Sequence, residues 1–248
     1  MREEHEIQLS GLTTMRVGGP AQRLVTVETT DELVDAVREV DDADDPLLVL
    51  AGGSNLVIAD EGFAGSVVRV ATAGITVESS DPGGLVTIRV AAGEIWDDVV
   101  ARAVAEGWSG IEALSGIPGC AGATPIQNVG AYGQEVAQTI RQVRVWDRRE
   151  QGVRIFTNAD CRFTYRHSLF KDEPRFVVLD VIKAQGLAFE ERAFSVEEAY
   201  AAREAFVTSA SQIVLPVVRI DGRPIGNGGP GLIATALRRD FHRHAEFS

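Results

Sequence analysis

The stretch IPGCAGATPIQNVGAYG, residues Ile117–Gly133, decides the fold of this 248-residue chain. Its glycines and prolines alternate with small and apolar residues, which excludes the interior of a regular helix or strand. Loops of this length inside a compact domain are usually functional or disordered, and the apolar content argues against disorder. Small residues let a backbone lie flat against a planar ring, and Gln127 and Asn128 offer donors and acceptors to its edge. The segment indicates either the wall of a planar ligand or a packed glycine-rich crossover.

A second glycine-rich turn, AGGSNLVI at residues 51–58, follows a short apolar run. Gly52 and Gly53 permit positive φ and close backbone approach, so consecutive N–H groups can converge on an anion. Ser54 and Asn55 add side-chain donors. The spacing matches neither the P-loop nor the GxGxxG fingerprint. The turn is typical of a pyrophosphate cradle or of an ordinary β-turn.

A third segment, CRFTYRHSLFK at residues 161–171, concentrates five polar or ionisable side chains in seven positions, namely Tyr165, Arg166, His167, Ser168 and Lys171. Arg166 is permanently cationic and can clamp an anion or a developing enolate in a bidentate manner. His167 alone is as typical of a solvent-facing side chain as of an acid or base. The segment indicates an anion site or a surface turn with ion pairs.

Hydrophobic periodicity predicts an α+β chain. One helix is expected from Thr30, with Thr30 as its cap, and a second from Glu94 to Gly107, with an apolar face of Ile95, Val99, Ala103 and Val104. Strands are expected at Leu47–Ala51 (a buried one), Ser66–Val70, Leu85–Ala92, Val143–Asp147, Val153–Phe156 and Phe176–Ala184. A shift in composition at Ala184–Gly186 predicts a boundary, so we expect lobes at 1–70 and 71–186 and a separate segment at 187–248.

Charge and hydropathy limit the partners. The chain has 24 Lys and Arg against 36 Asp and Glu, a net charge of −12, which repels a phosphate backbone and argues against nucleic-acid binding. An anionic small molecule needs a local pocket of arginines or backbone N–H groups. The mean hydropathy is +0.01, and no apolar run approaches the length of a signal peptide or a membrane span. We therefore expect a cytoplasmic protein without a membrane partner.

The two cysteines, Cys120 and Cys161, are isolated from each other and from any histidine. This spacing predicts two buried thiols, with no disulfide framework and no metal site.

Taken together and in this order, the three segments resemble the UDP-N-acetylenolpyruvoylglucosamine reductases, also called UDP-N-acetylmuramate dehydrogenases. The resemblance runs from about Leu12 to about Val181, through TTMRVGGPA, LAGGSNLVI, AAGEIWDDVV, GIEALSGIPGCAGATPIQNVGAYGQEV and DCRFTYRHSLFK. It implies a two-lobed FAD-binding core of the para-cresol methylhydroxylase type. It also implies that NADPH reduces the flavin, which passes hydride to the enolpyruvyl group of a UDP-sugar in peptidoglycan precursor synthesis.

The resemblance also implies residue roles. Gly52, Gly53, Ser54 and Asn55 would hold the FAD pyrophosphate, and further cofactor contacts would come from Gly119, Gly122, Thr124, Gln127, Asn128 and Gly133. Arg166 matches the active-site arginine of the family, where a fixed guanidinium would stabilise the negative charge that hydride addition creates. Tyr165 would contact the substrate.

The C-terminal part departs from this family. The proton-donating serine of a Ser-Phe-Phe motif and a late glutamate, which the family takes from its substrate domain, are absent after Lys171. Instead, residues 191–239 resemble the end of D-amino-acid aminotransferases of PLP fold type IV, most specifically in TSAS (208–211) and DGRPIGNGGPG (221–231). PLP catalysis needs a Schiff-base lysine, and neither Lys171 nor Lys183 matches that pattern. We therefore expect a short atypical C-terminal α/β segment without transaminase activity of its own.

Three hypotheses remain open from the sequence. The chain is an FAD-dependent reductase whose proton donor is unassigned, a truncated or fused flavin-binding protein without turnover, or a PLP-linked module completed by a partner chain. The apolar run Ile213–Val218 must be buried somewhere: against the core, against a second copy, or by aggregation.

Overall fold

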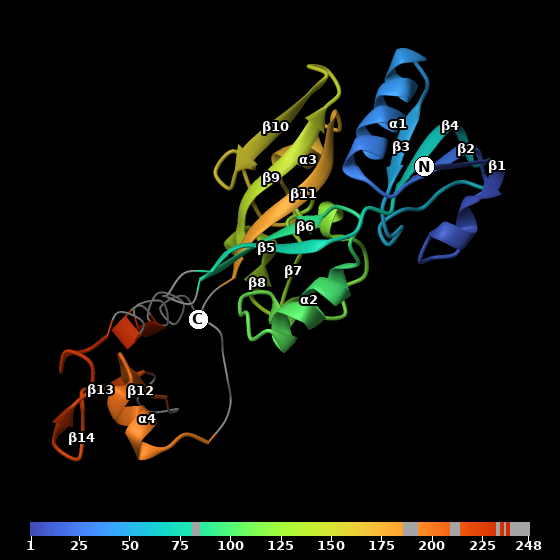
Figure 1. Ribbon diagram of the computed structural model, residues 1–248. Helices are drawn as coiled ribbons and strands as arrows, with labels where there is room; N and C mark the ends of the chain where they lie inside the picture. Colours follow the sequence, from blue (N-terminus) through green and yellow to red (C-terminus); the bar gives the residue numbers. More distant parts are fainter. Residues whose placement is uncertain (81–84, 186–192, 209–213, 232–233, 236, 239–248) are drawn as a thin grey trace. The chain divides into compact units, whose positions relative to one another are not determined.

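The computed structural model describes residues 1–80, 85–185, 193–208, 214–231, 234–235 and 237–238 (Figure 1). The chain divides into two compact units, Met1–Phe189 and Glu190–Ser248. Among the described residues, no helix has the length and apolar content needed to cross a bilayer.

The first sheet of the N-terminal unit has four strands. Their spatial order is β1 (Arg2–Gln8), β2 (Pro20–Val27), β4 (Phe63–Val70) and β3 (Leu47–Leu50). β1 pairs antiparallel with β2, whereas the β2–β4 and β3–β4 pairs are parallel. The short helix η1 (Leu9–Leu12) follows β1. The buried strand predicted at Leu47–Ala51 is wrong in one respect: β3 forms the edge of the sheet, and Val49 is 37% exposed.

Helix α1 (Thr30–Asp42) packs against this sheet through Leu33, Ala36, Val37 and Val40. Its cap is Thr29 rather than the predicted Thr30, because the Thr29 side chain accepts a hydrogen bond from the N–H of Glu32. Asp31 and Glu32 in the first turn favour this end of the helix electrostatically.

The second sheet is antiparallel throughout. Its order is β10 (Gly152–Thr157), β9 (Ile140–Asp147), β11 (Phe176–Gln185), β6 (Val86–Ala91) and β5 (Ile75–Ser80). Short elements fill the remaining path, namely η2 (Glu112–Leu114), η3 (Ala121–Ala123), β7 (Gly130–Ala131), β8 (Gln134–Glu135), η4 (Val136–Gln138) and α3 (Leu169–Asp172).

Helix α2 (Trp96–Ala105) buries Trp96, Val99, Val100 and Ala103. The predicted face was partly wrong, since Ile95 and Val104 are more than half exposed. Trp96 takes the inward position beside Ile95 and is fully buried, with its indole N–H bonded to the carbonyl of Leu114. The large ring therefore sets the rotation of the helix, shifting the apolar stripe by one residue.

Helix α1 joins the two sheets into one body. Arg148, in the turn after β9, donates from Nε to Asp41 of α1 at 2.9 Å, and the Arg38 guanidinium lies 5.0 Å from the ring centroid of Trp146 in β9. One apolar cluster runs from Val25 and Val68 of the first sheet through α1 to Val145 of the second. Loops at both sheets are thereby held on one rigid frame.

The C-terminal unit contains α4 (Val196–Ala201), β12 (Ala205–Val207), β13 (Leu215–Val217), β14 (Arg219–Ile220) and β15 (Arg223–Pro224). β12 pairs with β13 and β14 with β15, both antiparallel. Of the predicted TSAS motif, Thr208 is described and Ser209–Ser211 lie outside the described residues. In the apolar run at 213–218, Val214 is buried and Leu215 is 42% exposed, while Ile213 lies outside the described residues.

Candidate functional site

The glycine-rich turn after β3 lies directly against the long glycine-rich segment. A Cβ atom on Gly52 would stand 2.7 Å from the Cα of Gly119, so no side chain fits between the two backbones. The hydroxyl of Ser54 donates to the carbonyl of Pro118 at 3.3 Å. Two segments separated by more than sixty residues in the sequence thus meet through backbone contact at one place.

Gly53 is fixed by residues that follow η1. It has φ +63°, and a Cβ there would lie 2.0 Å from the carbonyl oxygen of Leu12. The N–H of Thr14 donates to the Gly53 carbonyl at 3.0 Å. Only glycine meets both demands, a left-handed conformation and a close backbone neighbour. Residues 12–14 were not among the predicted site residues, because a Thr-Thr pair carries no local signal of such a role.

The turn presents unused donors. Within the described residues, the backbone N–H groups of Gly53, Ser54 and Asn55 donate no hydrogen bond. Unpaired N–H groups in a partly buried turn cost free energy unless water or a ligand accepts from them. Three consecutive donors beside Gly119, which has φ +119°, suit the oxygens of a diphosphate. The donor set therefore fits the pyrophosphate of a dinucleotide such as FAD.

A side-chain hydrogen bond links this turn to the predicted site residues of the long segment. Asn55 donates from Nδ2 to Oε1 of Gln127 at 3.2 Å. The two side-chain amides thus join the turn to the long segment, and each retains donors and acceptors for further hydrogen bonds.

Asn128 has a structural role. It is 1% exposed, with φ +43°, and its Nδ2 donates to Glu135 Oε2 at 2.9 Å and to the Thr164 carbonyl at 3.0 Å. Its Oδ1 accepts from the N–H of Ala137 at 3.1 Å. These bonds occupy both amide hydrogens and join three segments of the chain, around residues 128, 135–137 and 164. A contact between Asn128 and a cofactor therefore stays a prediction. Glu135, which the sequence analysis did not single out, completes this arrangement.

Three other predicted residues differ in their surroundings. Gly122 packs on β6, since its Cβ would lie 2.6 Å from that of Ala92, and its N–H donates to the Ala92 carbonyl at 2.8 Å. Thr124 is buried and donates from Oγ1 to the Ala121 carbonyl at 2.8 Å. Gly133 has φ +84° and open space around it. Gly122 and Thr124 therefore shape the segment from inside, whereas Gly133 lies at its surface.

Arg166 is anchored to the long segment. Its Nη2 donates to the carbonyl of Gly130 at 2.6 Å, and its guanidinium carbon lies 5.7 Å from the ring centroid of Tyr165. Arg166 has φ +54° and Tyr132 has φ +50°, conformations that side-chain-bearing residues adopt rarely and mainly at functional sites. The remaining donors of Arg166 form no hydrogen bond within the described residues and are available to an anion. Tyr165 is 82% exposed beside it.

The other members of the third segment support this turn. Ser168 is fully buried, donates to the Ile126 carbonyl at 2.7 Å and caps α3 by accepting from the N–H of Phe170. His167 forms a hydrogen bond of 3.0 Å with Asp172, and the ammonium of Lys171 lies 3.4 Å from the Arg166 carbonyl. Ser168 is therefore a positioning residue for the turn that carries Arg166.

Neither thiol is a nucleophile. Both cysteines are free and buried, as predicted. Burial raises the pKa of Cys161 to about 12 and also raises the pKa of Cys120, so both remain protonated near neutral pH. The described residues contain no cluster of three or more His, Cys, Asp or Glu side chains able to hold a metal.

The three predicted segments thus converge. The turn at 52–55 contacts residues 118–119 and 127, and residues 126–130 are bonded to residues 164–168 through Ser168, Asn128 and Arg166. The free N–H groups of the turn at 52–55 and the guanidinium of Arg166 are thus linked through the long segment. Such an arrangement can hold a dinucleotide and place a second anionic molecule beside Arg166.

Comparison with curated proteins shows close relatives. The chain is 54% identical to the UDP-N-acetylenolpyruvoylglucosamine reductase of Streptomyces coelicolor over 182 residues, covering 73% of this chain and 46% of the relative. It is 49% identical to the enzyme of that name from Thermobifida fusca over 213 residues, covering 86% of this chain and 59% of the relative. The chain spans about half the length of the curated relatives it matches.

Solved structures share the fold. The UDP-N-acetylenolpyruvylglucosamine reductase of Thermus caldophilus has a TM-score of 0.60 at 24% identity, over 96% of this chain and 95% of that one. Cholesterol oxidase from Brevibacterium sterolicum has a TM-score of 0.55 at 14% identity, over 81% of this chain and 41% of that one. This chain therefore shares its mixed helix and strand architecture with that reductase and that oxidase.

The family match falls on the same part of the molecule. Residues 21–155, which contain the turn at 52–55 and the long segment at 117–133, match the FAD binding domain family. The geometry and the match agree on one surface, and the chain belongs to the FAD binding domain family.

Proposed function

We propose that this chain is the flavin-binding part of a UDP-N-acetylenolpyruvoylglucosamine reductase. The observation that carries the proposal is the convergence of the turn at 52–55, the segment at 117–133 and the Arg166 turn, in a chain about half identical to reductases of that name. When bound, FAD would supply the hydride chemistry, with NADPH as the hydride source and the enolpyruvyl group of a UDP-sugar as the acceptor, and a proton from a donor not assigned in this chain would complete the reduction.

The chain's own residues supply binding and charge. The free N–H groups of Gly53, Ser54 and Asn55 hold the pyrophosphate, while the absence of side chains at Gly52 and Gly119 lets the two backbones that form this site pack closely. Tyr165 and Arg166 would contact the second molecule. Negative charge that develops beside the substrate carboxylate is stabilised by the Arg166 guanidinium, whose direction the Gly130 carbonyl fixes.

A visible spectrum of the purified protein tests this function. We expect the yellow flavin bands to bleach with NADPH under anaerobic conditions and to return when UDP-N-acetylglucosamine enolpyruvate is added. A flavin that bleaches and never reoxidises with the sugar nucleotide would identify a cofactor-binding protein without this reaction. A colourless protein that takes up no added FAD would overturn the flavin site itself.

Arg166→Ala separates binding from chemistry. We expect FAD binding to change less than twofold and the substrate-driven reoxidation to fall about 100-fold or more, since removal of one oxyanion donor typically costs that much. Stopped-flow absorbance of the flavin measures both. Normal reoxidation by the variant would contradict the role given to Arg166.

A further inference from the structure

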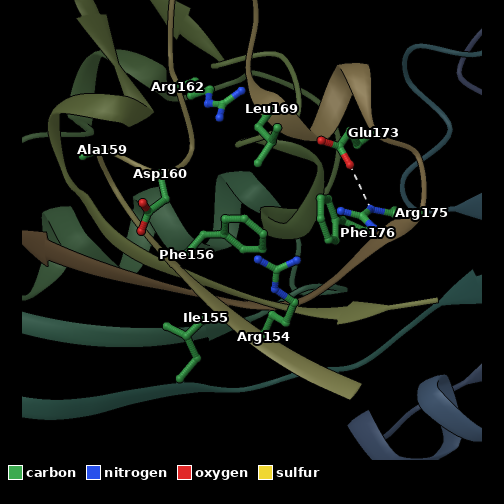
Figure 2. A pocket seen from close by; sticks show the side chains of 10 residues that line it. All are labelled: Arg154, Ile155, Phe156, Ala159, Asp160, Arg162, Leu169, Glu173, Arg175 and Phe176. Carbon is green, nitrogen blue, oxygen red and sulfur yellow. Dashed lines mark ion pairs between the residues drawn. The ribbon is translucent and has the colours of Figure 1, made fainter. Parts of the chain in front are cut away.

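A pocket of about 400 Å³ lies between β10, α3 and the turn at residues 157–162. Figure 2 shows its lining, to which Arg154, Phe156, Asp160, Arg162, Glu173 and Arg175 contribute charge and ring surface. None of the residues assigned above to the flavin site lines it. Its volume is in the range that holds a small organic molecule.

The pocket concentrates arginine side chains in an acidic protein. Three arginines and two carboxylates line it, and the buried carboxylate of Asp147 pairs with Arg154 and Arg175 behind it, whereas the whole chain carries a net charge of −12. Figure 2 shows the guanidinium of Arg154 beside the rings of Phe156 and Phe176, with Arg162 on the opposite wall. A concentration of guanidinium groups against the global field is what recognition of an anion requires.

The carboxylates of the pocket already have partners. Glu173 pairs with Arg175 at 2.8 Å, and Asp160 accepts from the N–H of Thr157 at 3.0 Å and from its hydroxyl at 2.6 Å. These bonds from Thr157, with a smaller contribution from Arg162, lower the pKa of Asp160. Both acids are therefore held to their partners and leave arginine donors for a ligand.

Arg154 uses only part of its donor set. Its Nη1 donates to the fully buried Asp147 at 3.1 Å, and its remaining nitrogens form no hydrogen bond within the described residues. The guanidinium carbon lies 4.9 Å from the Phe156 ring centroid and 5.5 Å from that of Phe176. The guanidinium packs against this edge-to-face pair of rings, which together with Asp147 fixes its direction before any ligand arrives.

Arg162 has no hydrogen bond or ion pair of its side chain among the residues that the structure describes. Its backbone, in contrast, is fixed: the N–H of Arg162 bonds to the Ala159 carbonyl, and the N–H of Cys161 bonds to the Thr157 carbonyl at 3.1 Å. A guanidinium without a hydrogen bond, close enough to Asp160 to help lower the pKa of that carboxyl, thus lines the pocket on a fixed turn.

We propose that this pocket binds a phosphate group, free or as a small monoester. Two guanidinium groups on opposite walls match the several oxygens of a phosphate better than the single plane of a carboxylate. The proposal concerns binding only and is independent of the proposed reductase activity.

Isothermal titration of the full chain saturated with FAD tests the proposal, because the flavin then blocks its own anion site. The probes are phenyl phosphate, benzoate and inorganic phosphate. We expect phenyl phosphate and inorganic phosphate to bind at least about 10-fold more tightly than benzoate and to weaken as salt rises. Tighter binding of phenyl phosphate than of inorganic phosphate would identify a monoester as the ligand, and the reverse order would identify the free ion. Equal binding of benzoate would overturn the assignment to a phosphate.

Arg162→Gln should weaken phenyl phosphate binding about 10-fold or more, with Arg162→Lys recovering part of it and FAD binding unchanged in both. The matched control is Arg149→Gln, which removes the same charge at an exposed arginine 76% accessible to solvent and outside the pocket. It should change the affinity less than twofold. Equal binding by Arg162→Gln and wild type, or equal losses in Arg162→Gln and the control, would refute the pocket.

Discussion

The two units of the chain hold their structure in different ways. The unit at 1–189 has two apolar clusters, the larger of which runs through two sheets and two helices, and its long loops are held by buried side chains such as Ser168 and Asn128. The described part of the unit at 190–248 has only three buried apolar side chains, Val214, Ile225 and Ala234. Several of its large apolar residues are exposed, including Phe194 at 70%.

Exposed polar contacts help to hold the second unit together. The Tyr200 hydroxyl donates to Asp221 at 2.8 Å, and the Arg223 guanidinium lies 4.6 Å from the Tyr200 ring centroid. Exposed contacts of this kind contribute little to stability, whereas buried apolar area contributes most of it. A ligand surface whose groups must be held precisely therefore depends on the rigid, apolar frame of the first unit.

The largest effect is expected at Gly53, where the first unit is tightest. Gly53→Ala places a Cβ 2.0 Å from the Leu12 carbonyl oxygen at φ +63°, so the turn must move. We expect the free energy of unfolding to fall by about 2–5 kcal/mol and FAD affinity to fall at least about 10-fold. Flavin fluorescence titration and chemical denaturation measure the two effects.

Gly11→Ala is the control for this substitution, because a Cβ at Gly11 meets nothing within 4 Å. Its effect on stability should stay within about 0.5 kcal/mol. If Gly53→Ala behaved like Gly11→Ala, the turn would not be the rigid donor set that the site requires.

The sequence was informative wherever composition itself constrained the backbone. The turn at 52–55 and the segment at 117–133 stood out because their glycines exclude a regular helix or strand, and the resemblance implied the roles of Gly52, Gly53 and Gly119. The structure places Gly52 against Gly119 and Gly53 against Leu12. Asn128 could not be understood in the same way. Its partners Glu135, Thr164 and Ala137 depend on long-range packing, and a single sequence does not encode which side of an amide faces a ligand.

Local errors in the fold have similar causes. The face of α2 was misplaced because periodicity counts apolar residues equally, whereas the large ring of Trp96 decided which side was buried. β3 was expected to be buried because an apolar run does not reveal whether a strand lies at a sheet edge. In both cases tertiary neighbours, absent from the local pattern, determined the outcome.

Lys183 is a weakness inside the well-packed unit. Its side chain is completely buried in β11, its Nζ has no hydrogen-bond partner among the described residues, and it lies 4.6 Å from the Trp96 ring centroid. Burial lowers the pKa of Lys183 to about 7. We expect Lys183→Met to raise the free energy of unfolding by roughly 2 kcal/mol at pH 7, because it removes the desolvation of a charge.

The same residue predicts a pH dependence with a definite sign. The unfolded lysine keeps its proton to about pH 10.4, whereas the folded one loses it near pH 7, so the unfolded state binds more protons between these values. Stability should therefore rise with pH across this window, by up to about 1.4 kcal/mol per pH unit, and Lys183→Met should abolish that rise. Lys171→Met, at the chain's other lysine, is the control and should retain it. Parallel curves for all three proteins would show that Lys183 is not buried as described.

The smallest expected effect is the change in FAD affinity when the core of the second unit is weakened. Ile225 of the second unit is 2% exposed, and Ile88 in β6 of the first unit is fully buried. The same truncation to alanine can therefore be made in each unit. Each should destabilise its own unit by about 2–4 kcal/mol. Hydrogen exchange followed by mass spectrometry locates the loss, and FAD titration shows whether it reaches the site. Ile88→Ala should weaken FAD binding and Ile225→Ala should leave it unchanged within about twofold, because the proposed flavin donors and their supports all come from residues before 173. A matching loss of affinity in Ile225→Ala would mean that the second unit stabilises the flavin surface and that the two units act as one.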